Sequence, residues 1–296
     1  MPFFFVMAGF LLNLNKWGGC YKYFEIKLVK RLLLPYYLAE LLWYPFHMAK
    51  EIYFGHLLKI IFYRPLLESF LGIFSGKAWM LPLGPLWFLP CLLIAEIIFV
   101  ALYNRFGKNL FLFAVAILLS TYAGFELNRF GYLPLGFNVA LVSQIFLSAG
   151  ILIRKYKVVE RLTPIICGVL TLSVIFAFYI NERVEMSGAI YGDPILFYMG
   201  GLAGTVLLMK ISTLMTRGKI FSLISSCGRQ SMMILVLHPI IIELVYNLFV
   251  RNNFFTLDEM YTTSPIILAV TMTGTLIPLF IARRFGKLPV LRVFCA

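Results

Sequence analysis

The chain contains few charged residues for its length. Asp, Glu, Lys and Arg together make up 13% of its 296 residues, whereas 61% are hydrophobic. Soluble domains carry about 25% charged residues, so this chain has too little polar surface to cover a globule in water. Its apolar runs are continuous, without the alternation of a membrane β-barrel. The sequence therefore predicts an all-α fold, a polytopic transmembrane helical bundle that forms a single domain over residues 1–296.

Acidic residues, paired cysteines and familiar catalytic motifs are scarce. The chain has 13 Asp and Glu against 26 Lys and Arg, and five cysteines. Because basic residues mainly set the topology of a membrane protein, the net charge of +13 predicts no nucleic-acid partner. The cysteines include no CxxC pair, so neither a disulfide framework nor a metal site is predicted. No GxSxG, P-loop or HExxH motif indicates a soluble-type hydrolase or an ATPase, and no bound cofactor is expected.

Nine apolar segments are present, and most are long enough to cross a hydrocarbon core of about 30 Å. Segments 110–126 and 133–153 are separated by a short connection and are expected to form an antiparallel helical hairpin. The nine segments cover residues 2–14, 32–48, 85–103, 110–126, 133–153, 164–180, 194–211, 231–250 and 264–282.

Prolines mark the starts of some segments and predict kinks in others. A proline in the first turn of a helix removes no hydrogen bond, which suits Pro164, Pro194 and Pro265. Asp193, directly before Pro194, is a predicted N-cap. Prolines inside segments predict kinks, and these are Pro35, Pro45, Pro90, Pro239 and Pro278.

Lys and Arg are distributed unevenly between the two sets of loops. The loops after the first, third, fifth and seventh segments, together with the C-terminal tail, hold 19 of the 26, and the alternate loops hold 7. The positive-inside rule then predicts a cytoplasmic C-terminus. It places the loop 49–84, in which residues 65–76 are amphipathic and predict an interfacial helix, on the outer side. Three further loops, 127–132, 181–193 and 251–263, are expected on the same outer side.

With nine spans and a cytoplasmic C-terminus, the first segment would begin outside. The start "MPFFFVMAGFLLNLNKW" has no basic residue before its apolar run and no small-residue cleavage site, so it does not fit a signal peptide. One more helix before Met1 would place the N-terminus in the cytoplasm and make ten spans. We therefore expect a first helix upstream of Met1.

Five stretches of the chain carry a family resemblance. "MPFFFVMAGFLL" is similar to a family stretch "hMPlFFfiSGyl", "GPLWFLPCLLIAEI" (84–97) to "hLWFLpaLf", and "CGRQSMMILVLHPIII" (227–242) to "lG.nSm.iy.lH". "KLVKRLLLPYYL" (27–38) resembles a basic-then-proline start of a third helix, and "YGDPILFYMGGLAGTVLLMKIS" (191–212) resembles a late helix. In this order the five resemble the acyltransferase 3 family of integral-membrane acyltransferases, particularly its fucose 4-O-acetylase-like branch.

The resemblance implies a ten-span bundle in the bacterial cytoplasmic (inner) membrane. It implies an O-acyltransferase, and specifically an O-acetyltransferase, that uses cytoplasmic acetyl-CoA or another acyl-CoA as co-substrate. The acceptor would be a sugar hydroxyl of a cell-surface or lipid-linked glycan, so membrane lipid, acyl-CoA and glycan are the expected partners. The family's catalytic base is a histidine that ends its first helix, which here would lie upstream of Met1, and Ala8 stands where the family has serine.

His238 lies inside the segment 231–250, where an ionisable residue is a functional-site hypothesis. A neutral imidazole can accept a proton from a sugar hydroxyl, which makes His238 a candidate for the catalytic and the substrate site. The alternative is structural: the imidazole hydrogen-bonds a neighbouring helix and stabilises a kink at Pro239.

Basic residues before the second segment are candidates for binding acyl-CoA phosphates. Lys30 and Arg31 lie on the predicted cytoplasmic side, where cations attract anions and Arg binds phosphate bidentately. Arg229, before the segment 231–250, is a second candidate on that side. The alternative for these residues is topology together with contact with anionic lipid.

Two aromatic residues are further substrate-site candidates. Trp87, together with Phe88, either belongs to an interfacial aromatic belt or stacks on a sugar ring. Tyr36, after Pro35, either packs in the bundle or contacts substrate. Four polar residues inside segments must face the bundle interior, and these are Glu40, Glu96, Gln144 and Glu243.

Two other functions remain open from the sequence. A polysaccharide or lipid-linked-sugar exporter would also be polytopic, although the internal repeat that many transporters carry is not evident here. A relative of the acyltransferases that lacks the catalytic base would be inactive.

Overall fold

The computed structural model describes residues 1–13, 31–53, 84–131, 133–215, 218–250, 264–285 and 294. The chain divides into two compact units, and each is described by itself. Unit 1 comprises Met1–Leu33, Phe70–Ser75 and Trp87–Thr216, and unit 2 comprises Leu34–Ser69, Gly76–Leu86 and Arg217–Ala296.

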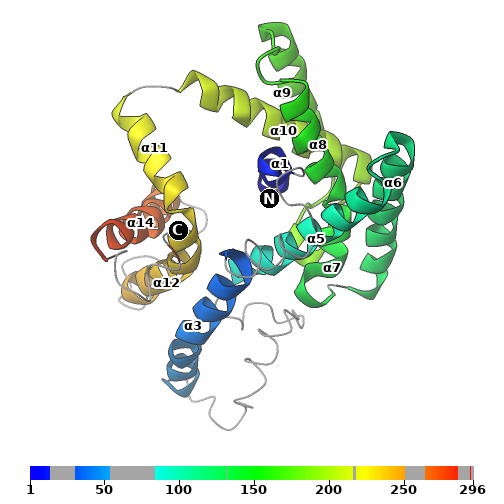
Figure 1. The fold of residues 1–296 in the computed structure, drawn as a ribbon. Helices are drawn as coiled ribbons and strands as arrows, with labels where there is room; N and C mark the ends of the chain where they lie inside the picture. The colour runs from blue at the N-terminus through cyan, green and yellow to red at the C-terminus, as the bar shows by residue number, and fades with distance from the viewer. Residues whose placement is uncertain are drawn as a thin grey trace. The chain divides into compact units, whose positions relative to one another are not determined.

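Regular structure in the described residues is helical apart from one isolated bridge between Glu185 and Ile190. Figure 1 labels the helices of both units. Unit 1 contains α1 (Pro2–Leu11), α5 (Phe88–Phe106), α6 (Leu110–Leu127), α7 (Phe137–Val142), α8 (Gln144–Lys155), α9 (Pro164–Ile180) and α10 (Pro194–Leu214). Unit 2 contains α3 (Leu34–Tyr53), α11 (Lys219–Arg229), α12 (Ser231–Val250) and α14 (Ser264–Phe285).

Each of the nine predicted segments falls on a helix or on a pair of helices, which confirms the all-α prediction. Four described stretches are long and apolar enough to cross a membrane, and a fifth is added if α7 and α8 together form one span. The four are Phe88–Phe106, Leu110–Phe130, Pro194–Leu214 and Pro265–Phe285. Shorter apolar helices cover Pro2–Leu11, Pro164–Ile180 and Ser231–Ile242.

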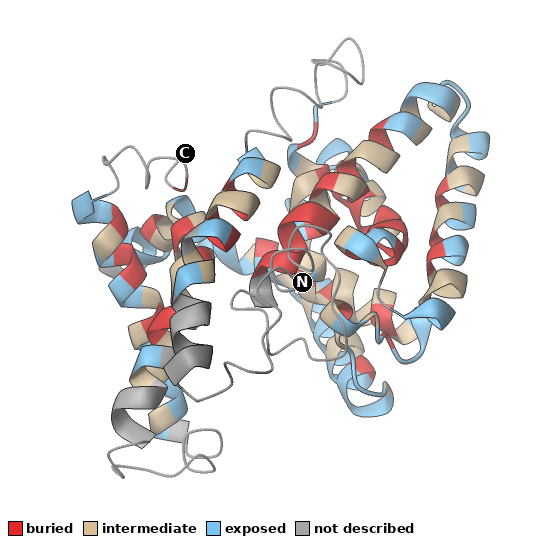
Figure 2. Cartoon of the chain, turned by 90° about the horizontal axis from the view of Figure 1, so that it is seen from below, coloured by how far each residue is buried: buried red, intermediate tan, exposed pale blue. Residues whose placement is uncertain are grey.

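The helices expose large apolar side chains along their length. Leu110 on α6 is 75% exposed, and Ile165 and Leu172 on α9 are 80% and 66% exposed. Exposed positions, drawn pale blue in Figure 2, run along the helices rather than only at their ends. Soluble monomers rarely expose continuous apolar surface of this kind, and it fits a bundle whose outer surface contacts lipid.

The predicted segment 133–153 is not one continuous helix. It breaks at Ser143 into α7 and α8, which are bent by 52° relative to one another. Polar side chains replace part of the backbone ladder at this break. The Ser143 hydroxyl donates to the Val139 carbonyl (2.7 Å), and the Gln144 amide donates to the carbonyls of Ala140 (2.8 Å) and Ala95 (3.1 Å). Side-chain donors that bind helix carbonyls are a recognised cause of bends.

Pro35 lies near the start of α3, directly after π-helical residues 31–33, and Pro90 lies near the start of α5, after the 3-10 helix Gly84–Trp87. The kinks predicted at these two prolines therefore stay predictions. Pro45, Pro239 and Pro278 lie inside helices, as predicted.

Helix α3 continues to Tyr53, so the beginning of the predicted outer loop 49–84 is helical. Residues 65–76, the predicted interfacial helix, lie outside the described residues.

Helices α1 and α8 approach one another so closely that only glycine fits at two contact points. A Cβ atom on Gly9 would lie 2.0 Å from the carbonyl oxygen of Leu147, and one on Gly150 would lie 2.0 Å from that of Val6. Small residues allow this close contact between membrane helices. The contact fixes α1, which also packs on α10, inside unit 1.

Candidate functional site

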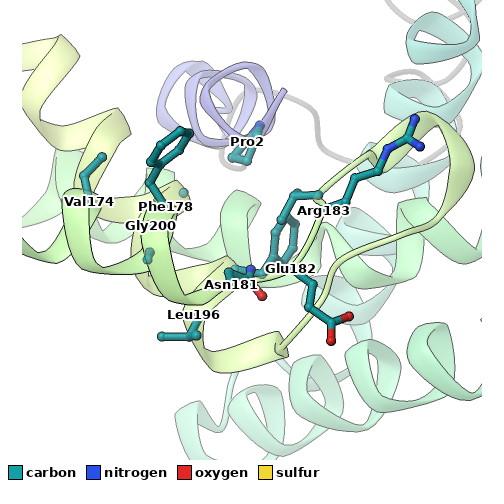
Figure 3. Close-up of a pocket in the computed structure, with 12 residues that line it drawn as sticks. Pro2, Val174, Phe178, Asn181, Glu182, Arg183, Leu196 and Gly200 are labelled. Carbon is teal, nitrogen blue, oxygen red and sulfur yellow. The ribbon is translucent and has the colours of Figure 1, made fainter.

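Two pockets lie against α1 and α10 within unit 1, toward opposite ends of α10. The first, here called the Glu182 pocket, has a volume of about 460 Å³ and is formed by the start of α1, the end of α9 with the segment after it, and the start of α10. Its lining includes Pro2, Phe178, Asn181, Glu182, Arg183 and Gly201. Figure 3 shows Pro2 on α1 and Phe178 on α9, with the side chains of Glu182 and Arg183 pointing apart on the segment after α9.

Hydrogen bonds fix the backbone around the Glu182 pocket. The Asn181 amide donates to the Tyr191 carbonyl (3.2 Å), and its oxygen accepts from the Asp193 backbone N–H (2.7 Å). Arg183 forms an ion pair with Glu185. Glu182, in contrast, forms no hydrogen bond or ion pair with another described residue, so its exposed carboxylate is available to a ligand.

The floor of the Glu182 pocket depends on two adjacent glycines at the start of α10. A Cβ on Gly200 would lie 2.9 Å from Cβ of Ala177, and a Cβ on Gly201 would lie 3.0 Å from the Phe146 ring and 3.1 Å from Pro2. Larger residues here would push α10 away from its neighbours. The glycines therefore keep α1, α9 and α10 close together beneath the pocket.

Asp193 caps α10 as predicted. Its carboxylate accepts hydrogen bonds from the backbone N–H groups of Ile195 (2.9 Å) and Leu196 (3.0 Å). Because the same residue is also bound to Asn181, the start of α10 is tied to the segment that lines the pocket.

The second pocket, here called the Lys157 pocket, has a volume of about 500 Å³. Phe3, Met7 and Phe10 on one face of α1 form an apolar wall. Polar and charged side chains come from the end of α8, the turn after it and the end of α10, and these are Arg154, Lys157, Glu160, Ser212 and Thr213.

The two pockets share one face of α10. Gly201 lines the first pocket and Met209 and Ser212 line the second. These residues recur every three or four positions, so they lie on one side of α10. Thr205 lies between them on that side, is 2% exposed and donates its hydroxyl proton to the Gly201 carbonyl (2.7 Å). Eight helical residues, or about 12 Å of rise, separate Gly201 from Met209.

The helix ends at each pocket agree with the predicted alternation of loops. Segment 181–193, predicted to be outside, lines the Glu182 pocket, and the basic loop after α8, predicted to be cytoplasmic, lines the Lys157 pocket. Each pocket is thus lined by helix ends that are predicted to lie on the same side of the membrane. Which side is cytoplasmic stays a prediction.

The residues predicted for the site from sequence are divided between the two units, and none of them lines either pocket. Lys30 lies outside the described residues. Arg31 is exposed in unit 1. Trp87 is 4% exposed and packs edge-to-face against Phe88, which contacts Phe5 of α1 in the same way. This burial does not fit an interfacial belt, where the ring would contact headgroups.

Unit 2 holds the other three predicted residues, Tyr36, Arg229 and His238. Tyr36 is buried in α3 and packs edge-to-face against Tyr37. Arg229 is exposed at the end of α11, where its guanidinium donates to the hydroxyls of Ser225 (2.7 Å) and Ser226 (3.1 Å). Their roles in substrate binding stay predictions.

His238 makes a local contact in α12. Its Nδ1 lies 2.9 Å from the carbonyl oxygen of Ile234 and 3.1 Å from that of Leu235. Since a carbonyl oxygen only accepts hydrogen bonds, Nδ1 is assigned the proton and Nε2 carries the lone pair. His238 thus bonds its own helix rather than the neighbouring helix that the structural alternative predicts, and Nε2 remains able to accept a proton. Its role in the site stays a prediction.

Polar residues inside the spans face the interior, as predicted. Glu40 in unit 2 and Glu96 and Gln144 in unit 1 are all buried. The side chain of Glu243 is outside the described part of the chain.

Sequence reasoning missed both pockets. A signal for the Glu182 pocket was present, because residues 181–185 read "NERVE", a dense polar cluster directly after a span in a chain that is 13% charged. The cations of the Lys157 pocket were interpreted only as a topology signal. Neither pocket could be located without the close approach of α1 to α8 and α10.

Apolar helices with lipid-facing surfaces define the protein as a multi-pass membrane protein, and its first unit has two pockets toward opposite ends of α10. A protein-family model described as an acyltransferase domain matches residues 1–283. The chain therefore belongs to the acyltransferase 3 family of membrane acyltransferases, which confirms the resemblance seen in the sequence. Comparisons with curated proteins and with solved structures gave no match.

Proposed function

We propose that the protein is an O-acetyltransferase of the bacterial cytoplasmic membrane. It transfers an acetyl group from cytoplasmic acetyl-CoA to a sugar hydroxyl of a cell-surface or lipid-linked glycan. Membership of the family supports acyl transfer in a membrane. The observation that supports a two-sided reaction is the pair of pockets toward opposite ends of α10, since donor and acceptor would then reach this helix from opposite sides.

The Glu182 pocket suits a sugar. Phe178 offers an exposed aromatic face for the apolar C–H face of a sugar ring, and the carboxylate of Glu182 can accept hydrogen bonds from hydroxyl groups. Arg183 supplies donors at the same rim. The pocket lies at the end of unit 1 that the charge distribution places outside, where a surface glycan would be found.

The reaction itself is balanced without an external oxidant or reductant. A base removes the proton of the sugar hydroxyl, the oxygen attacks the thioester carbonyl, and a C–O bond forms as the C–S bond breaks. The CoA thiolate leaves and takes up a proton. Among the described residues, the Nε2 atom of His238 is the candidate proton acceptor.

The test is release of free CoA thiol by the full gene product in lipid nanodiscs, with acetyl-CoA and a panel of acceptor glycans. We expect thiol release that depends on acceptor, together with an acetylated glycan detected by mass spectrometry. Movement of unmodified glycan across proteoliposomes without acetyl-CoA would instead establish an exporter. Absence of both activities across the panel would contradict the proposal and indicate an inactive relative.

A further inference from the structure

The turn after α8 carries a concentration of positive charge at the Lys157 pocket. Residues 154–161 include Arg154, Lys155, Lys157 and Arg161 against one acid, Glu160. Arg154 donates to the carbonyl oxygen of Leu12 (2.6 Å), which holds its guanidinium at the end of α1. The ammonium group of Lys157 makes no hydrogen bond or ion pair with any residue that the structure describes. A cation held at a pocket mouth without a protein partner is suited to an anionic ligand.

The wall of the Lys157 pocket changes from charged to apolar along α1. Phe10, Met7 and Phe3 follow one another on one face of the helix, away from the cations. Phe3 and Phe10 are seven positions apart, which is about 10 Å of helix. The ligand that fits this wall has an anionic end and a long, narrow and weakly polar arm.

The α10 side of the Lys157 pocket adds hydrogen-bond acceptors. The hydroxyls of Ser212 and Thr213 donate to the carbonyl oxygens of Met209 (2.7 Å) and Lys210 (2.7 Å). Their oxygen lone pairs therefore remain for N–H donors of a ligand. The carboxylate of Glu160 is a further acceptor at the charged end.

We propose that the Lys157 pocket binds the acyl-CoA donor, with its phosphates at Arg154 and Lys157 and its pantetheine arm along the α1 wall. This assignment rests on the proposed function and gives the donor a site in unit 1. The arm of CoA carries amide N–H groups that suit Ser212 and Thr213, and its adenine amine suits Glu160. Phosphatidylglycerol shares the phosphate but has no such amides.

The site of the thioester follows from the same geometry. The apolar wall ends at Phe3, and the neighbouring residue, Pro2, lines the Glu182 pocket. An acyl group carried at the end of the arm would thus lie beside the acceptor pocket.

The experiment measures CoA affinity by isothermal titration with the purified full chain in phosphatidylcholine nanodiscs. Lys155→Glu is the matched control for Lys157→Glu. Both substitutions change the net charge by the same amount, and the two positions are two residues apart. Only Lys157 lines the pocket, while Lys155 contacts the ring of Tyr156. Lys157 has a φ of 51°, and glutamate adopts this conformation at a similar cost to lysine. Lys157→Gln serves as a milder variant should the charge reversal impair folding.

We expect Lys157→Glu to weaken CoA binding about tenfold or more, and Lys155→Glu to change it less than about twofold. Pantetheine, which lacks phosphate, should bind wild type and Lys157→Glu equally. Equal losses in the two charge reversals, or no loss in Lys157→Glu and Lys157→Gln, would overturn the assignment. Displacement of CoA by phosphatidylglycerol in the nanodisc would overturn it in favour of a lipid site.

Failure of this assignment is separable from failure of the proposed function. If wild type transfers acetyl groups and Lys157→Glu keeps the wild-type KM for acetyl-CoA, the function stands and the donor lies elsewhere. If wild type releases no thiol but binds CoA in a way that depends on Lys157, the pocket assignment stands and the acyltransferase proposal falls.

Discussion

The imidazole Nδ1 of His238 lies 3.1 Å from the carbonyl oxygen of Leu235, the acceptor that Pro239 leaves without its helical N–H donor. In an uninterrupted helix the N–H of residue 239 would bind this oxygen. The histidine therefore replaces, from its side chain, a hydrogen bond that the next residue cannot make.

This relationship predicts the outcome of a double-mutant cycle in α12. His238→Ala should lower the free energy of unfolding by about 1 kcal/mol. The loss should be smaller in a Pro239→Ala background, because an alanine at this position restores an N–H donor to the Leu235 carbonyl. Thermal unfolding of the four proteins in detergent measures the coupling. Equal losses in both backgrounds would contradict the replacement of the missing hydrogen bond.

The same four proteins also distinguish a structural role of His238 from a role in the reaction. If Nε2 of His238 serves the reaction, His238→Ala loses transferase activity in both backgrounds, whatever its effect on stability. Activity that returns when Pro239 is also replaced would show that His238 acts only through the helix.

The close contact of α1 with α8 predicts that the effect of a Gly→Ala substitution on stability depends strongly on its position. Gly9→Ala and Gly150→Ala each place a Cβ 2.0 Å from a backbone carbonyl oxygen, and overpacking of this kind costs about 1–3 kcal/mol. Gly168→Ala in α9 is the control, since a Cβ there meets no atom within 4 Å. Unfolding midpoints in detergent should fall for the first two variants and stay level or rise for the third. Three equal midpoints would mean that α1 does not lie against α8 as described.

Tyr191 and Tyr198 form a second matched pair within one aromatic cluster of unit 1. The hydroxyl of Tyr198 donates to the Val142 carbonyl (2.7 Å), whereas that of Tyr191 is buried without a hydrogen-bond partner in the described structure. Tyr198→Phe should therefore cost about 1 kcal/mol, while Tyr191→Phe should be neutral or stabilising. Chemical or thermal unfolding of both variants checks the contrast, and a larger loss for Tyr191→Phe would contradict it.

Tyr191 also predicts a pH effect. Burial, and to a lesser degree the nearby Cys91 and Tyr198, raise the pKa of Tyr191 above the ordinary tyrosine value. The neutral form is thus favoured in the folded state, and the associated stability is present below about pH 10 and lost as the pH rises above it. Tyr191→Phe should reduce this alkaline loss of stability. If stability falls with rising pH equally in wild type and Tyr191→Phe, Tyr191 is not buried in its neutral form.

Local signals in the sequence predicted the local features of the fold. Asp193 before Pro194 is a short-range pattern, and the cap it forms depends on neighbouring backbone N–H groups only. The break at Ser143 was missed because a single serine inside an apolar run does not determine whether its hydroxyl binds its own helix. The bend also involves Gln144, whose amide reaches Ala95 on α5, a contact distant in sequence.

The candidate site was harder to predict for the same reason. Both pockets are lined by α1, which Gly9 and Gly150 allow to approach α8, and glycine in an apolar helix does not indicate which helix it contacts. The charges at Lys157 and Glu182 were visible, but a charge near a span is interpreted first as a topology signal. The predicted residue His238 was identified correctly as a polar group needing a partner, and its partner proved to be its own helix.

The central claim is that the two pockets of unit 1 open on opposite sides of the membrane. Single-cysteine labelling tests it, with Glu182→Cys and Lys157→Cys placed separately in a chain whose five native cysteines have been replaced. The account predicts that a membrane-impermeant maleimide labels the Glu182→Cys variant in intact cells and the Lys157→Cys variant only in inverted vesicles. Labelling of both variants from the same side, or from the opposite sides to those predicted, would contradict it.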